Sequence, residues 1–226
     1  MEKVIAIIPA RGGSKRLPRK NILSLGGVPL VSRVIRTAQG SGIFDDIIVS
    51  SEDYEILDIA QEEGVIAHSR PLQLASDRST VVDTCIEALQ THPGKVFCCI
   101  YATAVMLSEE TLRVAAEMFL STKSSSVLMG VSKYNYHPVQ ALTVTDDGNA
   151  KLLFPKYKSL QSQFYPLARV SNGTFYWAKV DTFLKEKTFY SQSLALFDVP
   201  DSEVCDVDTE EDYLRLVELF KKSDKA

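Results

Sequence analysis

Short apolar runs alternate with helical stripes along the first 131 positions of the chain. The runs are rich in β-branched residues, as in buried strands of parallel sheets, and cover residues 4–8, 47–51, 65–67, 96–101 and 126–131. Between them, apolar residues recur three or four positions apart, which predicts helices over 31–38, 56–64, 80–90 and 112–119. This alternation predicts an α/β fold: a doubly wound parallel sheet with helices on both faces, of the three-layer Rossmann-like type.

The alternation stops after Ser132. Residues 142–145 and 151–154 flank an Asp-Asp-Gly-Asn turn and predict a hairpin, and the polar stretch 155–166 predicts a loop. A strand over 173–178, a short helix over 180–185, a strand over 194–199 and a C-terminal helix follow, with residues 221–226 frayed at the end. We therefore expect a single domain over residues 1–226, with a β-rich insertion at about 133–170.

Composition narrows the class of protein. A hydrophobic content of 45% in 226 residues is enough for the core of one large domain. The net charge of −4 argues against a nucleic-acid binder. There is no run of eighteen apolar residues, and a first strand at Val4 leaves no room for a signal peptide. Four cysteines without metal spacing predict reduced thiols, so we expect a cytoplasmic protein that does not bind a membrane.

A basic, glycine-rich stretch follows the first predicted strand. Five of the 25 Lys and Arg residues lie within residues 11–20. The carboxyl edge of such a sheet is where these folds bind ligands, and Gly12 and Gly13 let the backbone turn its N–H groups toward a phosphate. The spacing matches neither GxxxxGK[ST] nor GxGxxG. The stretch predicts a polyphosphate site, and the alternative is a basic surface loop with ordinary turn glycines.

Two aspartates precede the C-terminal helix. Residues two apart in an extended segment point to the same side, so Asp206 and Asp208 would form a site for Mg²⁺. The alternative is helix capping by Asp208 or Thr209, with acidic residues in the first turn favouring the helix dipole. Capping does not explain Asp206.

The motif IIPARGGSKRLPRKN at 7–21 resembles the signature of the acylneuraminate cytidylyltransferases, which make CMP-sialic acid and CMP-activated relatives. Further segments are similar to the family: SRPLQLASD at 69–77, CCIYATA at 98–104, NGTFYW at 172–177 and DVDTEEDY at 206–213. The resemblance implies an α/β/α nucleotidyltransferase fold, a CTP substrate, a Mg²⁺ cofactor, and a homodimer in which the insertion reaches the partner. One departure is Val105-Met106, where many relatives have a proline.

The resemblance also implies roles for individual residues. Those implied for the nucleotide are Arg11, Gly12, Gly13, Ser14, Lys20, Asn21, Arg70, Asp77, Ser79 and Thr103. Arg11, Lys20 and Asp208 would serve catalysis, with Asp206 and Asp208 on the metal. Candidates for the sugar are Tyr101, Gln140, Arg169 and Asn172; the guanidinium fork of Arg169 suits a carboxylate. Taken alone, Gln140, Arg169 and Asn172 are each equally consistent with a surface or structural polar residue.

The sugar itself is less well specified. CCIYATA, HPVQAL at 137–142 and FYW at 175–177 resemble the branch that activates pseudaminic acid, whereas Asn172-Gly173 is closer to the sialic-acid branch. We expect CMP transfer from CTP to the anomeric hydroxyl of a nine-carbon α-keto sugar acid, with release of pyrophosphate. Alternatives are a CMP-N-acetylneuraminic or CMP-legionaminic acid synthetase, a CMP-Kdo synthetase, a metal-dependent glycosyltransferase and an inactive sugar-nucleotide binder. No residue stands out as the general base.

Overall fold

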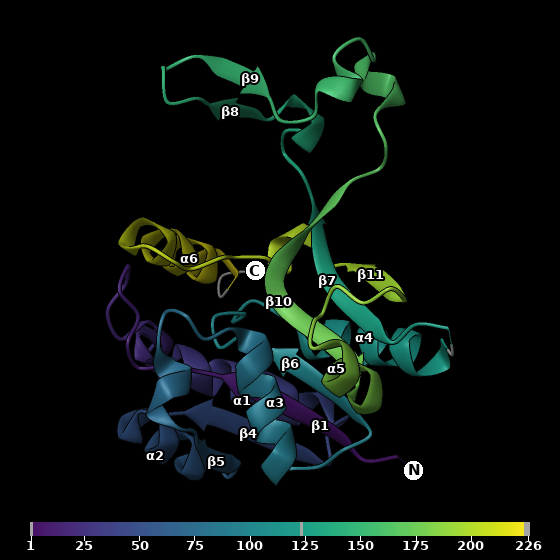
Figure 1. Ribbon diagram of the computed structural model, residues 1–226. Helices are drawn as coiled ribbons and strands as arrows, with labels where there is room; N and C mark the ends of the chain where they lie inside the picture. The colour runs from purple at the N-terminus through teal and green to yellow at the C-terminus, as the bar shows by residue number, and fades with distance from the viewer. Residues whose placement is uncertain (1, 123, 224–226) are drawn as a thin grey trace.

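A seven-stranded sheet forms the centre of the computed structural model, which describes residues 2–122 and 124–223 (Figure 1). The strand order is β11-β7-β10-β6-β1-β4-β5. The bounds are β1 Val4–Pro9, β4 Asp46–Ser51, β5 Ile66–Ser69, β6 Val96–Ile100, β7 Val127–Lys133, β10 Arg169–Lys179 and β11 Leu194–Asp198. These strands lie within a few residues of the predicted ones, except that β10 begins at Arg169 rather than Gly173.

One strand breaks the parallel pattern that we expected. β10 runs antiparallel to both of its neighbours, β6 and β7, while every other pairing in the sheet is parallel. A parallel strand needs a crossover connection, usually a helix. The chain between β7 and β10 contains no α-helix and returns alongside β7, so the strand that follows must run the other way.

Helices cover both faces of the sheet, which confirms the predicted three layers. One face carries α1 Leu30–Ser41, α2 Tyr54–Glu62 and α4 Glu109–Ser121; the other carries α3 Val81–Thr91 and α5 Val180–Glu186. Because side chains alternate along a strand, Val4, Ala6 and Ile8 enter the first core while Ile5 and Ile7 enter the second. Each of these isoleucines is fully buried, which stabilises the fold by about 1.5–3 kcal/mol per side chain.

The last helix, α6 (Glu210–Ser223), packs beside the loop that follows β1. A small third core joins Leu216 of this helix to Leu17, Leu25 and Leu30. The helix continues through residues 221–223, which we expected to fray, and residues 224–226 lie outside the described part of the chain. The contact fixes the loop around the two-residue strands β2 Ser24–Leu25 and β3 Val28–Pro29.

Residues 134–168, here called the arm, project away from the sheet (Figure 1). The predicted hairpin is present as β8 Leu142–Val144 and β9 Ala150–Leu152. The rest contains short 3-10 helices: η3 Pro138–Gln140, η4 Pro155–Tyr157 and η5 Ser162–Phe164, the last two within the stretch predicted as a loop. Large apolar side chains on the arm are exposed, among them Tyr136, Leu142, Val144, Phe164 and Leu167.

No helix in residues 2–122 and 124–223 is both long enough and apolar enough to cross a membrane.

Candidate active site

Three adjoining cavities lie at the carboxyl edge of the sheet, where parallel α/β folds bind ligands. The inner cavity, of about 300 Å³, lies between the ends of β1 and β6 and the segment 70–84. The loop cavity, of about 250 Å³, lies against residues 11–21. The bulge cavity, of about 520 Å³, lies between residues 170–176 of β10 and residues 204–208. Lys20 lines all three, so it stands where they meet.

The basic stretch forms one wall of the loop cavity. Arg11, Lys15, Arg16 and Lys20 line this cavity. Arg19 does not: it adopts a left-handed backbone conformation, with φ of 58°, and its guanidinium pairs with Asp53 and Glu55 beside the start of α2. The next residues form the 3-10 turn η1 Lys20–Ile22. Four of the five cations are thus available to an anion, and the fifth anchors the loop.

Two carboxylates face these cations. Asp77 pairs with Lys15 and accepts a hydrogen bond of 3.1 Å from Arg11. The two cations, Lys15 first, lower the pKa of Asp77. Asp208 accepts a hydrogen bond of 3.0 Å from Lys20, and its other oxygen lies 2.7 Å from Arg16. The carboxylates of Asp77 and Asp208 therefore hold the loop cations in place. The oxygens of a bound polyphosphate can pair with the same cations instead of these carboxylates.

The two glycines of the motif differ in what they require. A Cβ atom on Gly12 would lie 2.2 Å from Oδ2 of Asp53, so only glycine fits there. Its N–H donates to Glu52 at 2.8 Å, rather than pointing at a phosphate as predicted. Gly13 has open space at its Cβ position. Ser14 lines the loop cavity, and neither glycine lines any of the three cavities.

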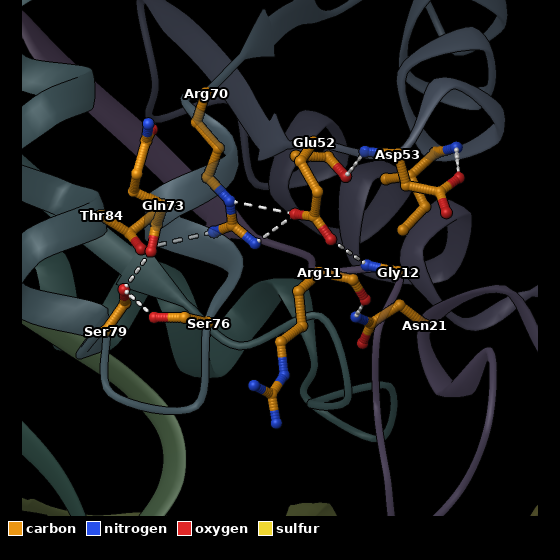
Figure 2. Close-up of polar contacts among 12 residues, drawn as sticks. Arg11, Gly12, Asn21, Glu52, Asp53, Arg70, Gln73, Ser76, Ser79 and Thr84 are labelled. Atoms are coloured by element: carbon orange, nitrogen blue, oxygen red, sulfur yellow. Dashed lines mark hydrogen bonds and ion pairs between the residues drawn. The ribbon is translucent and has the colours of Figure 1, made fainter.

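Segment 70–84 closes the inner cavity from the opposite side. The buried Arg70 donates through Nε and Nη2 to one oxygen of Glu52, at 3.2 and 2.8 Å, and through Nη1 to Thr84 at 3.3 Å (Figure 2). The hydroxyl of Ser79 donates to the backbone oxygen of Gln73 in the 3-10 helix η2 Leu72–Ala75. Arg70 and Ser79 both line the cavity, so hydrogen bonds hold its wall in place before any ligand enters.

Other residues of this half are fixed by local bonds. Asn21 donates from Nδ2 to the backbone oxygen of Arg11 at 2.8 Å. Thr80 and Asp83 form a capping box at the start of α3, and this backbone and hydroxyl bonding lowers the pKa of Asp83. Tyr101 and Thr103, at the end of β6, line both the inner and the bulge cavities. Burial raises the pKa of Tyr101 well above its usual range, so this hydroxyl stays protonated and can donate a hydrogen bond.

A β-bulge in β10 shapes the third cavity. Between Ser171 and Tyr176 the register with β7 shifts, and Gly173 adopts φ of 65°, which favours glycine. The bulge gives Asn172 its bonds: Nδ2 donates to Ser132 at 3.1 Å, and Oδ1 accepts from the hydroxyl of Thr174 at 2.6 Å. The Asn-Gly pair of the sequence motif is thus explained by backbone geometry, and Asn172 lines the cavity.

A smaller apolar cavity, of about 220 Å³, adjoins the bulge cavity through shared tyrosines. Tyr101 and Tyr176 form part of its wall, and Tyr176 stacks on Phe189 with ring centroids 4.5 Å apart. The remaining wall comes from Val81, Val82, Thr188 and Tyr190. Burial raises the pKa of Tyr176, whose hydroxyl is bonded to Ser171 at 2.6 Å. The space suits an apolar substituent on a ligand that is otherwise polar.

The segment before α6 holds the two predicted metal ligands on one side. Asp206 and Asp208 both line the bulge cavity, while Val207 between them is fully buried in the core beneath the loop. The surrounding protein, which partly desolvates Asp206, and the neighbouring Asp208 raise the pKa of Asp206. Two carboxylates that repel each other in this way suit a divalent cation.

The capping alternative is settled by the hydrogen bonds at the start of α6. Thr209, not Asp208, caps this helix: its hydroxyl accepts from the N–H of Asp212, whose carboxylate accepts in return from the N–H of Thr209 at 2.9 Å. Asp208 uses only its backbone N–H in this box, so its carboxylate is left for Lys20 and Arg16. Upstream, Glu203 of the 3-10 helix η6 Asp201–Glu203 ties the segment to the start of α4 through Ser108 and Thr111.

Two predicted sugar-binding residues lie outside the three cavities. Gln140 is on η3 in the arm, and Arg169 pairs in a fork with Asp198 of β11, which raises the pKa of Arg169 and lowers that of Asp198. Their roles stay predictions. Val105 and Met106, which depart from the proline of many relatives, pack against the core around Leu17.

The sequence reasoning missed several residues of the site. Glu52 holds Gly12 and Arg70 together, and Ser132, Ser171 and Tyr176 line the bulge cavity. A strand over 47–51 was predicted, and Glu52 directly follows it at the carboxyl edge beside β1, which is a signal that could have identified this residue. Ser132 gives no such signal, because only strand pairing brings it to Asn172.

The chain has a Rossmann-like sheet with a basic loop after its first strand and a paired-aspartate segment before its last helix, and three cavities lie between them. This combination defines a nucleotidyltransferase. The cytidylyltransferase family profile matches residues 5–222, and the chain belongs to this family. It is 37% identical to pseudaminic acid cytidylyltransferase of Campylobacter jejuni, over 93% of both chains. It is 30% identical to N-acylneuraminate cytidylyltransferase of Streptococcus agalactiae, over 95% of this chain and 52% of the relative.

Solved structures agree on the fold. The structure of CMP:2-keto-3-deoxy-manno-octonic acid synthetase complexed with CTP superposes with a TM-score of 0.73 at 16% identity, over 98% of this chain and 99% of the other. This likeness confirms the predicted fold, while the family profile and the Campylobacter jejuni relative confirm the predicted family, its pseudaminic branch and the enzyme class.

Proposed function

We propose that this enzyme transfers CMP from CTP to the anomeric hydroxyl of a nonulosonic acid, pseudaminic acid or a close relative, and releases pyrophosphate. The observation that carries the proposal is the meeting of three cavities at Lys20. A reaction that joins a nucleotide to a sugar needs a nucleoside site, a phosphate site and an acceptor site around one reacting phosphorus. The names of the two relatives, pseudaminic acid cytidylyltransferase and N-acylneuraminate cytidylyltransferase, specify sugar acids of this class.

The nucleotide half of the proposal follows from charge. CTP would place its base and ribose in the inner cavity, against Arg70 and Thr103, and its phosphates in the loop cavity. There Arg11, Lys15, Arg16 and Lys20 would exchange their carboxylate partners for phosphate oxygens. At an effective dielectric near 20, each close pair is worth up to roughly 4 kcal/mol, less where water screens it.

The acceptor half follows from the lining of the bulge cavity. Its wall presents hydroxyl and amide groups of Ser132, Ser171 and Asn172, which suit the hydroxyls and carboxylate of a sugar acid. The adjoining apolar cavity beside Tyr176 would take an acyl methyl group. This combination of a polar cavity and a small apolar one favours an acylamino sugar over a plain sugar.

Transfer would proceed by in-line displacement at the α-phosphate. The anomeric hydroxyl gives up its proton to solvent water as its oxygen forms a bond to the α-phosphorus, and the bond from phosphorus to the bridging oxygen breaks, so pyrophosphate leaves with the electron pair. Arg11 and Lys20 would bind the phosphates and stabilise the charge that develops on the leaving group. Lys20 suits this role because its side chain is only 18% exposed, so its charge is weakly screened.

We also propose Mg²⁺ as the cofactor. Asp206 and Asp208 would hold it, since they share one side of an extended segment and Mg²⁺ takes one or two carboxylates together with water and phosphate oxygens. When bound, the ion would neutralise phosphate charge and lower the pKa of the attacking hydroxyl. Asp208 would then exchange Lys20 and Arg16 for the metal, which frees both cations for the nucleotide.

Two further parts of the proposal concern assembly and location. The exposed apolar side chains of the arm support a homodimer, in which the arm of one copy, with Gln140, lies on its partner. Light scattering should then give twice the chain mass, and a variant with Leu142, Val144 and Leu167 changed to serine should be monomeric. The free thiols of Cys85, Cys98, Cys99 and Cys205 support a cytoplasmic location.

The test is pyrophosphate release with CTP, Mg²⁺ and a panel of pseudaminic, legionaminic and N-acetylneuraminic acids and Kdo. We expect the fastest release with pseudaminic acid. Fastest release with N-acetylneuraminic acid would instead support the alternative indicated by the Asn172-Gly173 bulge and by the Streptococcus agalactiae relative. CTP binding without release for any sugar would contradict the proposed function and favour a sugar-nucleotide binder.

A further inference from the structure

Glu52 joins the two walls of the inner cavity from behind. It lies just beyond the end of β4, one residue before the N-cap of α2, and its side chain is only 11% exposed. Oxygen Oε1 accepts the N–H of Gly12 at 2.8 Å, and Oε2 accepts both Nε and Nη2 of Arg70 (Figure 2). One carboxylate thereby connects the loop after β1 to the segment after β5.

The neighbouring residues hold the same loop at a second point. Asp53 caps α2 with Oδ1, which accepts the N–H of Glu55 at 3.1 Å, and its other oxygen pairs with Arg19. Arg19 has the left-handed φ of 58°, which costs a non-glycine residue energy unless its surroundings hold it there. The basic loop is thus fixed near both ends by residues of the β4–α2 junction.

Charge explains why a carboxylate is needed at Glu52. The guanidinium of Arg70 is 3% exposed, and a buried cation without a partner is strongly destabilising. The carboxylate of Glu52 neutralises this guanidinium and accepts the hydrogen of Nε and one hydrogen of Nη2, while Nη1 donates to Thr84. Arg70 lines the inner cavity, so its guanidinium is held there in one fixed orientation, without a net buried charge.

We infer that Glu52 is a positioning residue for the nucleotide: it sets Arg11, through the backbone of Gly12, and Arg70 at once, so that both walls have the spacing that a nucleoside triphosphate requires. The inference rests on the proposed function, because it takes CTP as the ligand of the inner and loop cavities. Glu52 lines none of the three cavities and acts only through these two neighbours.

The test compares Glu52→Gln with Glu63→Gln as a matched control. Glu63 is also a largely buried carboxylate, 15% exposed, that binds an arginine through both oxygens, but its partner Arg36 is remote from the cavities. For Glu52→Gln we expect the dissociation constant of CTP, measured by calorimetry, and KM for CTP to rise about tenfold, with KM for the sugar changed less than twofold. Glu63→Gln should lower Tm without changing either nucleotide value.

Glu52→Asp keeps the charge and removes one methylene, so it still neutralises Arg70 but is too short to reach Gly12 as well. We expect it to recover the Tm of the wild type more than its CTP affinity. Unchanged CTP affinity in both Glu52 variants, or an equal loss in Glu63→Gln, would overturn the inference and leave Glu52 a structural residue. Failure of the wild-type protein to bind CTP would instead contradict the proposed function itself, and this inference with it.

Discussion

The nucleotide side of the site, around the inner and loop cavities, is built differently from the acceptor side, around the bulge cavity. On the nucleotide side, ion pairs and a buried arginine connect three separate segments: the loop after β1, the β4–α2 junction and the loop after β5. On the acceptor side, the bulge in β10 and the aspartate segment supply hydroxyl, amide and carboxylate groups, and local bonds such as Asn172 to Thr174 fix them. Asp208 and Lys20 form the contact between the two sides.

This difference between the two sides indicates which of the two substrates, the nucleotide or the sugar, can differ between related enzymes. Changing one residue of the nucleotide side disturbs several segments at once, because its charges are shared. A residue of the acceptor side can change while its neighbours keep their backbone bonds. A common nucleotide and a variable sugar would produce this arrangement, and variants that separate the two sides can test it.

The largest effect should come from Asp208, where the sides meet. Asp208→Asn removes the charge that faces Lys20 and Arg16 and that would bind the metal, so kcat/KM should fall about 10²- to 10³-fold while the protein stays folded. Pyrophosphate release measures the first and circular dichroism the second. Asp201→Asn, exposed in the same segment, is the control and should keep wild-type activity. Near-wild-type turnover in Asp208→Asn would remove this residue from the site.

An intermediate effect is expected at Asn172. Asn172→Ala removes the amide that lines the bulge cavity, so KM for the sugar should rise about tenfold while KM for CTP stays unchanged. Steady-state kinetics with each substrate varied in turn gives both values. Asn149→Ala, which removes an equivalent amide from the turn of the arm hairpin, should change neither. An equal rise in both KM values would show that the two sides are not independent.

The smallest effect concerns pH and a histidine pair outside the three cavities. His92 bonds to the buried His68 of β5 at 3.1 Å, and burial together with His68 lowers the pKa of His92. In the unfolded chain His92 has an ordinary histidine pKa of about 6.5, so the unfolded chain binds a proton more readily than the folded protein. The contribution of His92 to the free energy of unfolding is therefore fully present above pH 6.5 and decreases as the pH falls below that value. Between pH 7.5 and 5.5 this contribution should lower Tm by about 1 °C.

Variants separate this contribution from other titrations. His92→Gln should make Tm less dependent on pH over that interval, while His137→Gln, in the arm, should leave the dependence as it is. An identical dependence in wild type and His92→Gln would show that His92 does not contribute.

The parts of the site that the sequence revealed are those within one continuous segment. Residues 11–21 follow a buried strand and combine glycine with positive charge, and Asp206 and Asp208 share a side because they are two apart. The parts that could not be predicted depend on pairing between segments. Three contacts of this kind join residues far apart in the chain: the antiparallel pairing of β10, the ion pair of Arg19 with Asp53, and the hydrogen bond from Gly12 to Glu52.

The sequence by itself determined the alternating strands and helices, the three layers, the family and the basic loop, because hydrophobic periodicity and local motifs act over a few residues. Only the tertiary structure decided which cations face a ligand, which carboxylates hold them, and where the bulge places Asn172. Those choices depend on burial and on the geometry between segments, since the energy of a charge or an amide is set by the partners that folding brings to it.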